Sequence, residues 1–176
     1  RFVARDSVER EVERLHQGIA AASEEIARNR NAVAHELGSK YAAIFESHIQ
    51  ILPDSKLREE LEEMIAQRHY SPEYAVSTTL DGYAERLRAG ASPYLAERAH
   101  DIVDLERGLL RNLLGRRREE LAHLTAPAVV LAHNLTPSET ANLDTRYVLG
   151  FVTEIGGAGG HTAIVAKGLE IPAVVG

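Results

Sequence analysis

Cysteine and tryptophan are absent from this 176-residue chain, and only one methionine is present. Without thiols the protein forms no disulfide bonds and no thiolate metal sites, a composition that fits a reducing cytoplasm. No apolar run approaches the ~20 residues that span a bilayer. Residues 1–6 lack both the apolar core of a signal peptide and an initiator methionine. We therefore expect a cytoplasmic segment of a longer polypeptide that does not enter a membrane.

An excess of positive charge is also lacking, since 20 basic residues face 26 acidic ones and give a formal net charge of −6. No long basic tract is present, which argues against a nucleic-acid partner. The basic run Arg116–Arg118 follows a predicted helix and is typical of side chains that complement a helix dipole. The acidic excess favours a basic protein partner through electrostatic steering.

Apolar residues in the first part of the chain recur every three or four positions, which predicts helices. The opening stripe consists of Val8, Val12, Leu15, Ile19, Ala22 and Ile26. Asp6 and Glu9 resemble a capping box that starts this helix. Gly38 is expected to break it, because glycine destabilises a helix interior.

Prolines and serines mark the later helix boundaries. Pro53 is expected to end a second helix. The pairs Ser71-Pro72 and Ser92-Pro93 each place a capping serine ahead of proline at the first helical position. Several helices with short connections predict an antiparallel bundle. Prolines and glycines interrupt the pattern too often for a coiled coil.

After Pro127 the pattern changes to short apolar runs that predict strands at 128–132, 148–153 and 171–175. A helix start at Thr136–Glu139 separates the first two strands, and a glycine-rich loop followed by a helix separates the last two. Strands that alternate with helices predict a parallel α/β sheet. Three strands make a thin domain, so we expect it to be incomplete in this chain.

The glycine-rich loop at 156–160 leads directly into His161 and Thr162. Such a loop suits an anion, because backbone N–H groups at the helix start point toward it. One interpretation is a dinucleotide site, but the G-x-G-x-x-G pattern that starts at Gly157 has Thr162 in place of its last glycine. The other makes His161 a nucleophile that carries a phosphoryl group, since imidazole offers a neutral nitrogen at neutral pH. On composition alone, a helix cap or surface histidine is the simpler alternative.

Four blocks of sequence occur in order and without long gaps. They are LTPSET at 135–140, VLGFVT at 148–153, GG with HTAIVA between 156 and 166, and IPAVVG at 171–176. These blocks closely resemble Enzyme I, the phosphoenolpyruvate–protein phosphotransferase of the bacterial sugar phosphotransferase system. The helical segments AIFESHI at 43–49 and LRNLLG at 110–115 also resemble this family, so the resemblance covers nearly the whole chain.

The resemblance implies a mechanism for the loop. In this family the histidine of the glycine loop takes phosphate from phosphoenolpyruvate and passes it to the phosphocarrier protein HPr, and that histidine falls on His161. Thr140 matches a threonine that hydrogen-bonds the active histidine, whereas chemistry alone also allows a threonine that bonds its own helix backbone. The expected phosphate-binding residues are Gly157, Gly159, Gly160 and Thr162.

The resemblance also implies a fold class, in which an antiparallel helical bundle is inserted into a swivelling α/β phosphohistidine domain. We expect the helical, HPr-docking subdomain at residues 6–122. The partial α/β domain is expected at 124–176, with residues 1–5 as a candidate addition.

The same resemblance predicts that HPr docks on the helices between Gly38 and Asp54. Glu46 and His48 are the expected partner-binding residues. Each has an alternative interpretation, because His48 fits the apolar face of a core and Glu46 fits a solvated surface.

Two departures from the family pattern bear on these expectations. Ala158-Gly159-Gly160 stand where the family has Arg-Thr-Ser, so a cation and two hydroxyls that hold phosphate are replaced by backbone N–H groups. Ser39-Lys40 follow Gly38 where the family's docking surface is acidic. We expect these changes to affect the reaction rate and the affinity for HPr more than the identity of the nucleophile.

The C-terminal part of Enzyme I, which binds phosphoenolpyruvate and Mg²⁺ and forms the dimer, has no counterpart here. No carboxylate cluster in the sequence has the pattern of a Mg²⁺ site. We therefore expect no cofactor within this chain, a monomeric state, and no use of phosphoenolpyruvate by the chain alone. Two alternatives are another phosphohistidine-domain enzyme, such as a dikinase or phosphoenolpyruvate synthase, and a non-catalytic helical module that only binds a partner.

Overall fold

The computed structural model describes residues 2–90, 92–115, 124–140, 143–156 and 161–176. The chain divides into two compact units. The first consists of Arg1–Glu25 and Ser47–Arg117, and the second of Ile26–Glu46 and Arg118–Gly176. The long helix α1 (Val8–Leu37) contributes to both. Residues 26–46 therefore group with the strands, whereas the sequence placed them within a helical subdomain at 6–122.

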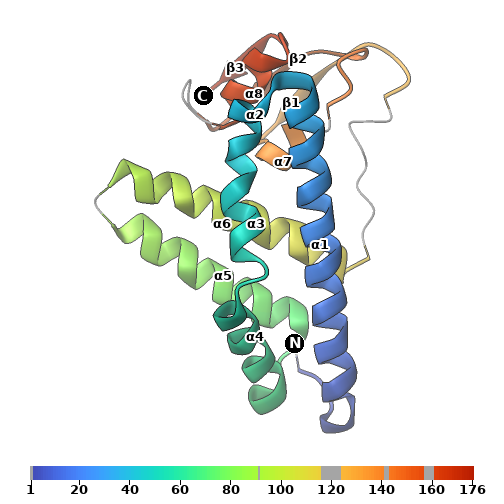
Figure 1. Ribbon diagram of the computed structural model, residues 1–176, viewed down its shortest axis with the longest axis vertical. Helices are drawn as coiled ribbons and strands as arrows, with labels where there is room; N and C mark the ends of the chain where they lie inside the picture. Colours follow the sequence, from blue (N-terminus) through green and yellow to red (C-terminus); the bar gives the residue numbers. More distant parts are fainter. Residues whose placement is uncertain (1, 91, 116–123, 141–142, 157–160) are drawn as a thin grey trace. The chain divides into compact units, whose positions relative to one another are not determined.

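Helices occupy most of the chain before the first strand (Figure 1). After α1 come α2 (Ser39–Ala42), α3 (Glu46–Ile51), α4 (Ser55–Arg68), α5 (Pro72–Ala89) and α6 (Pro93–Leu113), with 3-10 turns at Arg5–Ser7 and Ala43–Phe45. Strands and helices then alternate as β1 (Ala128–Ala132), α7 (Pro137–Thr140), β2 (Val148–Thr153), α8 (His161–Gly168) and β3 (Ala173–Val175). The predicted combination of helical bundle and α/β architecture is confirmed. Of the helices described, none is long and apolar enough to cross a membrane.

The apolar faces of its helices hold the first unit together. α5 and α6 lie side by side as an antiparallel pair (Figure 1). Gly18 lets α1 approach α6 closely, because a Cβ at this position would lie 2.7 Å from Leu113 Cδ2. The side chains in this unit with no exposed surface include Leu15, Leu61, Ile65, Val76, Leu80 and Leu109. Each contributes ~1.5–3 kcal/mol through burial, which makes this core the main source of stability in the unit.

The two predicted serine caps have different outcomes. The Ser71 hydroxyl accepts a hydrogen bond from the Tyr74 N–H at 3.4 Å, and Pro72 is the first residue of α5, as predicted. Ser92 precedes α6 but makes no side-chain cap hydrogen bond to any described residue, so that prediction is wrong in part. Pro93 favours the start of α6 even without a hydrogen bond from the Ser92 hydroxyl, because the fixed φ of proline suits the first turn of a helix.

The residues that were expected to start or end the other helices do so in some cases and not in others. Gly38 adopts φ 94° and separates α1 from α2, which confirms the predicted break. The predicted capping box of Asp6 and Glu9 is wrong, because Arg5–Ser7 form a 3-10 turn ahead of α1. Asp54 caps α4, where its carboxylate accepts from two backbone N–H groups.

The three strands form one parallel sheet in the order β1-β2-β3. Ala132 pairs with Thr153 and Thr153 with Val175, so all three strands end at the same edge. The buried core of this unit consists of Val130, Leu135, Leu143, Val148, Phe151, Ala166 and Ile171. The predicted parallel sheet is confirmed, although β3 begins two residues later than expected, because the Ile171 N–H donates to the Ala166 carbonyl of α8 and not to β2.

The grouping of residues 26–46 with the sheet has a direct cause in the packing of α8. α2 contacts α8. A Cβ on Gly168 would lie 3.0 Å from Leu37 Cδ1 and 3.2 Å from Tyr41 Cε1. The absence of a side chain at Gly168 therefore lets the end of α1 and the start of α2 close over α8.

One face of the sheet carries exposed apolar side chains. Val129, Leu131, Leu149 and Val174 each keep more than half of their surface exposed. Strand alternation places Val129, Leu131 and Val174 opposite the buried Val130 and Phe151, whereas Leu149 is the extra residue where the register shifts between Ala128 and Val129. Parallel sheets are ordinarily covered on both faces, and within the described residues this face is open.

Glu106 of α6 is a buried carboxyl group that faces α5. The Ser77 hydroxyl donates to its Oε1 at 2.8 Å. Burial raises the pKa of Glu106 above its ordinary value, and this effect outweighs the opposite effect of the Ser77 hydrogen bond. Asp81 raises the pKa further through charge repulsion.

This raised pKa predicts a pH-dependent stability. The folded state holds the Glu106 proton more tightly than the unfolded state, so the stabilisation is present below the unfolded pKa and lost as pH rises through the folded pKa. Glu106→Gln removes this titration. We expect the free energy of unfolding of the wild type minus that of the variant, measured by urea denaturation, to fall as pH rises above about pH 4, the ordinary pKa of a glutamate. The exposed Glu85→Gln serves as control, and a difference that grows with pH would contradict the assignment.

Candidate active site at the carboxyl edge of the sheet

α7 starts with a capping box. The Thr136 N–H donates to Glu139 Oε2 at 2.8 Å, and the Glu139 N–H donates to Thr136 Oγ1 at 3.3 Å. Two free donors of the helix end are thereby satisfied reciprocally. The predicted helix start at Thr136 is confirmed, and it fixes the segment that follows β1.

Thr140 is fully buried at the end of α7. Its hydroxyl donates to the Thr136 carbonyl at 2.9 Å, so it bonds its own helix backbone, as the alternative interpretation of this residue required. The hydroxyl oxygen keeps lone pairs that can accept a further N–H. The predicted bond between Thr140 and His161 involves a side chain outside the described part of the structure and stays a prediction.

α8 begins at His161, immediately after the glycine loop. The Thr162 hydroxyl donates to the Leu135 carbonyl, which ties the first turn of α8 to the segment between β1 and α7. The buried side chains of Val165 and Ala166 anchor the helix in the core. Backbone N–H groups of a first helical turn have no partner within the helix, so this end presents donors and the positive end of the dipole.

Part of the predicted phosphate-binding loop lies outside the described residues. This applies to Gly157, Gly159 and Gly160 and to the side chain of His161. Gly156 is described and adopts φ 153°, in a region that favours glycine. The loop thus leaves β2 through a backbone conformation that other residues rarely adopt.

Two ionisable residues that the sequence patterns did not indicate lie at the same edge. His133 follows β1 and Glu154 follows β2, and His133 Nδ1 lies 2.5 Å from Glu154 Oε2. Their position directly after predicted strands could have identified them as candidate site residues, because ligands in α/β proteins bind beyond the carboxyl ends of parallel strands.

Glu46, one of the two predicted docking residues, is exposed at the start of α3. Its Oε1 accepts hydrogen bonds from Arg30 Nη2 at 3.1 Å and Nε at 3.2 Å. This pair is about half exposed on both sides, so it contributes at most ~1 kcal/mol to stability. Its carboxylate is accessible to a partner.

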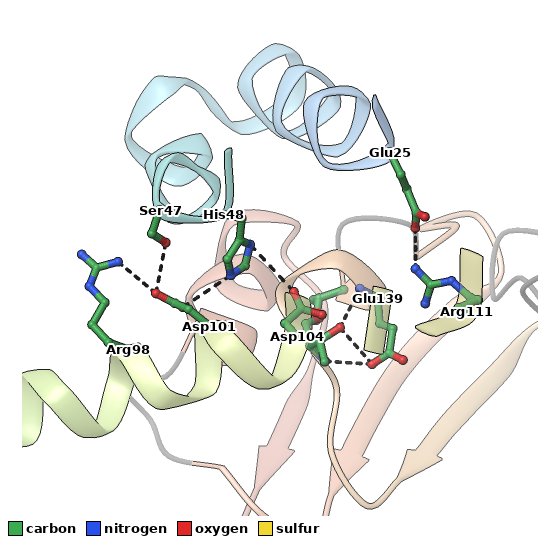
Figure 2. A network of polar contacts seen from close by, with 10 residues as sticks. Glu25, Ser47, His48, Arg98, Asp101, Asp104, Arg111 and Glu139 are labelled. Atoms are coloured by element: carbon green, nitrogen blue, oxygen red, sulfur yellow. Dashed lines mark hydrogen bonds and ion pairs between the residues drawn. The ribbon is translucent and has the colours of Figure 1, made fainter. Parts of the chain in front are cut away.

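His48, the other predicted docking residue, is only 1% exposed. Its Nε2 lies 3.6 Å from Asp101 Oδ1 and its Nδ1 lies 4.0 Å from Asp104 Oδ2 (Figure 2). Asp101 also accepts hydrogen bonds from the Ser47 hydroxyl and from Arg98. The imidazole is therefore buried against two carboxylates of α6, as the core interpretation of His48 expects, and its predicted role in partner binding stays a prediction.

Comparison with known proteins places the chain in a family. Residues 1–98 match the family described as PEP-utilising enzyme, N-terminal, and residues 124–176 match PEP-utilising enzyme, mobile domain. An NMR solution structure of Enzyme I is 36% identical with a TM-score of 0.83, covering 100% of this chain and 71% of that one. The chain belongs to the Enzyme I family of phosphoenolpyruvate-utilising enzymes. A structure described as the N-terminal domain of Enzyme 1 - Nitrogen is 28% identical with a TM-score of 0.73, over 99% of this chain and 71% of that one.

Curated relatives of this chain carry the name phosphoenolpyruvate-protein phosphotransferase. The relative from Haemophilus influenzae is 40% identical over 171 residues, which are 97% of this chain and 30% of that protein. The relative from Geobacillus stearothermophilus is 39% identical over 169 residues, or 96% of this chain and 29% of that protein. The chain thus spans about a third of the length of these relatives.

The buried position of His48 predicts a large effect on stability. His48→Ala truncates a fully buried side chain of α3 and removes its contacts with Asp101 and Asp104 of α6, and such a large-to-small change at a buried site costs about 2–5 kcal/mol. We expect that loss in urea denaturation, with faster amide hydrogen exchange in α3 and α6. The exposed Gln50→Ala on the same helix should stay within about 0.5 kcal/mol of the wild type. Equal stability of both variants would show that His48 does not hold α3 on α6.

Proposed function

We propose that this chain is the phosphohistidine-bearing part of an Enzyme I-type phosphotransferase and that His161 is its nucleophile. A ring nitrogen of His161 attacks the phosphorus of phosphoenolpyruvate. The N–P bond forms as the bond to the enolate oxygen breaks, and the enolate leaves as pyruvate after protonation. The phosphoryl group then passes to a histidine of HPr. We assign the reaction to the cytoplasm, where phosphoenolpyruvate is produced.

The observation that carries this proposal is the start of α8 at His161, directly after the glycine loop and at the carboxyl edge of a parallel sheet. Phosphoryl transfer depends mainly on positioning and on stabilisation of charge. A helix N-terminus supplies both, through free N–H groups and its dipole. The bond from Thr162 to Leu135 holds this end of α8 in place.

Thr140 acts as a positioning residue in this proposal. Its hydroxyl proton is committed to the Thr136 carbonyl at 2.9 Å. The Thr140 oxygen can therefore only accept a hydrogen bond from the imidazole. By accepting one ring N–H of His161, it would leave the other ring nitrogen free to attack. Because Thr140 is fully buried, it offers the imidazole a fixed partner with little competition from water.

Phosphoenolpyruvate and Mg²⁺ bind outside residues 1–176 in this proposal. Within the described residues, no three His, Asp or Glu side chains converge as metal ligands would. Mg²⁺ neutralises negative charge on the phosphoryl donor where it binds.

HPr docks, we propose, on the surface that includes Glu46, and the segment Gly38–Asp54 presents it. The exposed Glu46 carboxylate supports this placement, as does the acidic balance of the chain. His48 contributes indirectly, since its contacts with Asp101 and Asp104 hold α3. The partner is then expected to present basic groups to this surface.

A labelling experiment on the full-length parent protein tests the nucleophile. With radiolabelled phosphoenolpyruvate and Mg²⁺, we expect acid-labile, base-stable label on the wild type and none on His161→Ala. Thr140→Val should slow labelling about 10–100-fold, because it removes the acceptor that orients the imidazole. Thr140→Ser keeps the hydroxyl and should retain most of the rate.

Label that persists on His161→Ala would reject the nucleophile. An unlabelled wild type would favour the non-catalytic alternative, in which the chain only binds a partner. Equal labelling rates for Thr140→Val and Thr140→Ser would show that the Thr140 hydroxyl does not orient His161 and serves only its bond with the Thr136 carbonyl.

A binding experiment tests the docking surface. Glu46→Lys replaces attraction by repulsion at an exposed site, so we expect about a 10-fold weaker affinity for ¹⁵N-labelled HPr in an NMR titration, with a smaller effect at high salt. Glu59→Lys makes the same charge change on the exposed surface of α4 and should leave the affinity within about 2-fold. Equal affinities for both variants would place HPr elsewhere.

A further inference from the structure

The two threonines of the candidate site are held by neighbouring carbonyl groups. The Thr162 hydroxyl donates to the Leu135 carbonyl. The Thr140 hydroxyl donates to the Thr136 carbonyl at 2.9 Å. Because Leu135 and Thr136 are consecutive, their Cα atoms are about 3.8 Å apart, and both hydroxyls are bound to one short stretch of backbone. This stretch therefore sets where the end of α7 and the start of α8 lie relative to each other.

The peptide group between Leu135 and Thr136 is itself held on both sides. Its carbonyl accepts from Thr162, and its N–H donates to Glu139 Oε2 at 2.8 Å. The Thr136 hydroxyl donates to the same carboxylate oxygen at 3.1 Å. Leu135 and Thr136 are both buried, and hydrogen bonds are stronger where the local dielectric is low. The peptide group is thus a fixed reference point for both helices.

The bond to Leu135 limits what the Thr162 side chain can do. A hydroxyl has one proton, and the proton of the Thr162 hydroxyl is committed to the Leu135 carbonyl. The Thr162 side chain is then not a donor for a phosphoryl oxygen. Its backbone N–H lies in the first turn of α8, where N–H groups have no partner within the helix. The phosphate contact expected of Thr162 therefore falls to its backbone, which leaves a separate role for the hydroxyl.

The position of Thr162 also determines the position of His161, because the two residues are consecutive in the first turn of α8. The buried Val165 and Ala166 hold α8 through apolar contacts, which have no preferred direction. A hydrogen bond does have one. A displacement of about 1 Å between reacting groups can cost about 100-fold in rate. The Thr162 hydroxyl therefore supplies the directional contact that fixes the start of α8.

We propose that Thr162 is a positioning residue for phosphoryl transfer, acting through the bond that Thr140 makes to the imidazole of His161. This inference rests on the proposed function of His161. The Thr162 bond keeps the start of α8 beside Leu135, next to the carbonyl that orients Thr140. The imidazole then meets the Thr140 oxygen in one orientation. Without the Thr162 hydroxyl, the first turn of α8 can shift, and the ring loses its fixed distance to that oxygen.

The full-length parent protein provides the test, in single-turnover labelling with radiolabelled phosphoenolpyruvate and Mg²⁺. Thr162→Val removes the hydroxyl but keeps the branched shape of the side chain and the backbone N–H. We expect it to label about 10–100-fold more slowly than the wild type. The concentration of phosphoenolpyruvate that gives half the maximal rate should stay unchanged, because the donor binds outside this chain.

Two further variants complete this comparison. Thr162→Ser keeps the hydroxyl and should label within about 3-fold of the wild type. Thr145→Val removes a hydroxyl from an exposed turn in the same unit and serves as the matched control, with a labelling rate equal to that of the wild type. All rates are measured below the midpoint of thermal unfolding of every variant, so that they belong to folded protein.

A double-mutant cycle shows whether Thr162 acts through Thr140. If both hydroxyls serve one orientation of the imidazole, the second substitution has little left to remove. We therefore expect the Thr140→Val, Thr162→Val double variant to label within about 3-fold of the slower single variant. Losses that multiply would overturn the positioning role, because each hydroxyl would then act independently.

The outcomes separate this inference from the function on which it rests. Labelling of Thr162→Val at the wild-type rate, with His161→Ala unlabelled, would overturn the role of Thr162 and leave the nucleophile intact. A Thr162→Ser variant as slow as Thr162→Val would show that the hydroxyl is not the group that matters. An unlabelled wild type, or label that survives in His161→Ala, would overturn both proposals.

Discussion

Parallel pairing of β1 with β2 is the constraint on which the rest of the site depends. Because Ala132 pairs with Thr153, the residues that follow both strands emerge at one edge and not at opposite ends. That edge receives the capped start of α7 and the first turn of α8, joined by the bond from Thr162 to Leu135. An antiparallel pair would separate these groups by the length of a strand. The parallel pairing therefore determines where the polar groups of the candidate site lie, and the loops supply most of these groups.

Much of the fold could be predicted from local sequence signals. Gly38 and the Thr136–Glu139 capping box mark boundaries that depend on the backbone of a few residues, so the sequence was sufficient there. Ser92 and Asp6 have similar signals without the expected hydrogen bonds, because packing of the whole helix decides whether a cap is used. The grouping of residues 26–46 with the sheet depends on contacts with α8 and has no local signal.

The site was predictable to a smaller extent. The position of His161 at the start of a helix follows from the glycine loop, whereas its role as a nucleophile comes from the resemblance to Enzyme I and stays a prediction. His48 shows the limit of such reasoning, because a polar residue on an apolar helix face does not reveal its partners, here two carboxylates about 50 residues further along the chain. The pairing of His133 with Glu154 depends on strand register, which becomes visible only once the sheet is formed.

The exposed apolar face of the sheet affects how this chain behaves in isolation. Val129, Leu131 and Val174 are exposed apolar side chains on the same face of the sheet. Such patches favour self-association, and the tendency grows with protein concentration. The 176 residues alone would therefore have a tendency to self-associate through this face, and the monomeric state expected from the sequence stays a prediction.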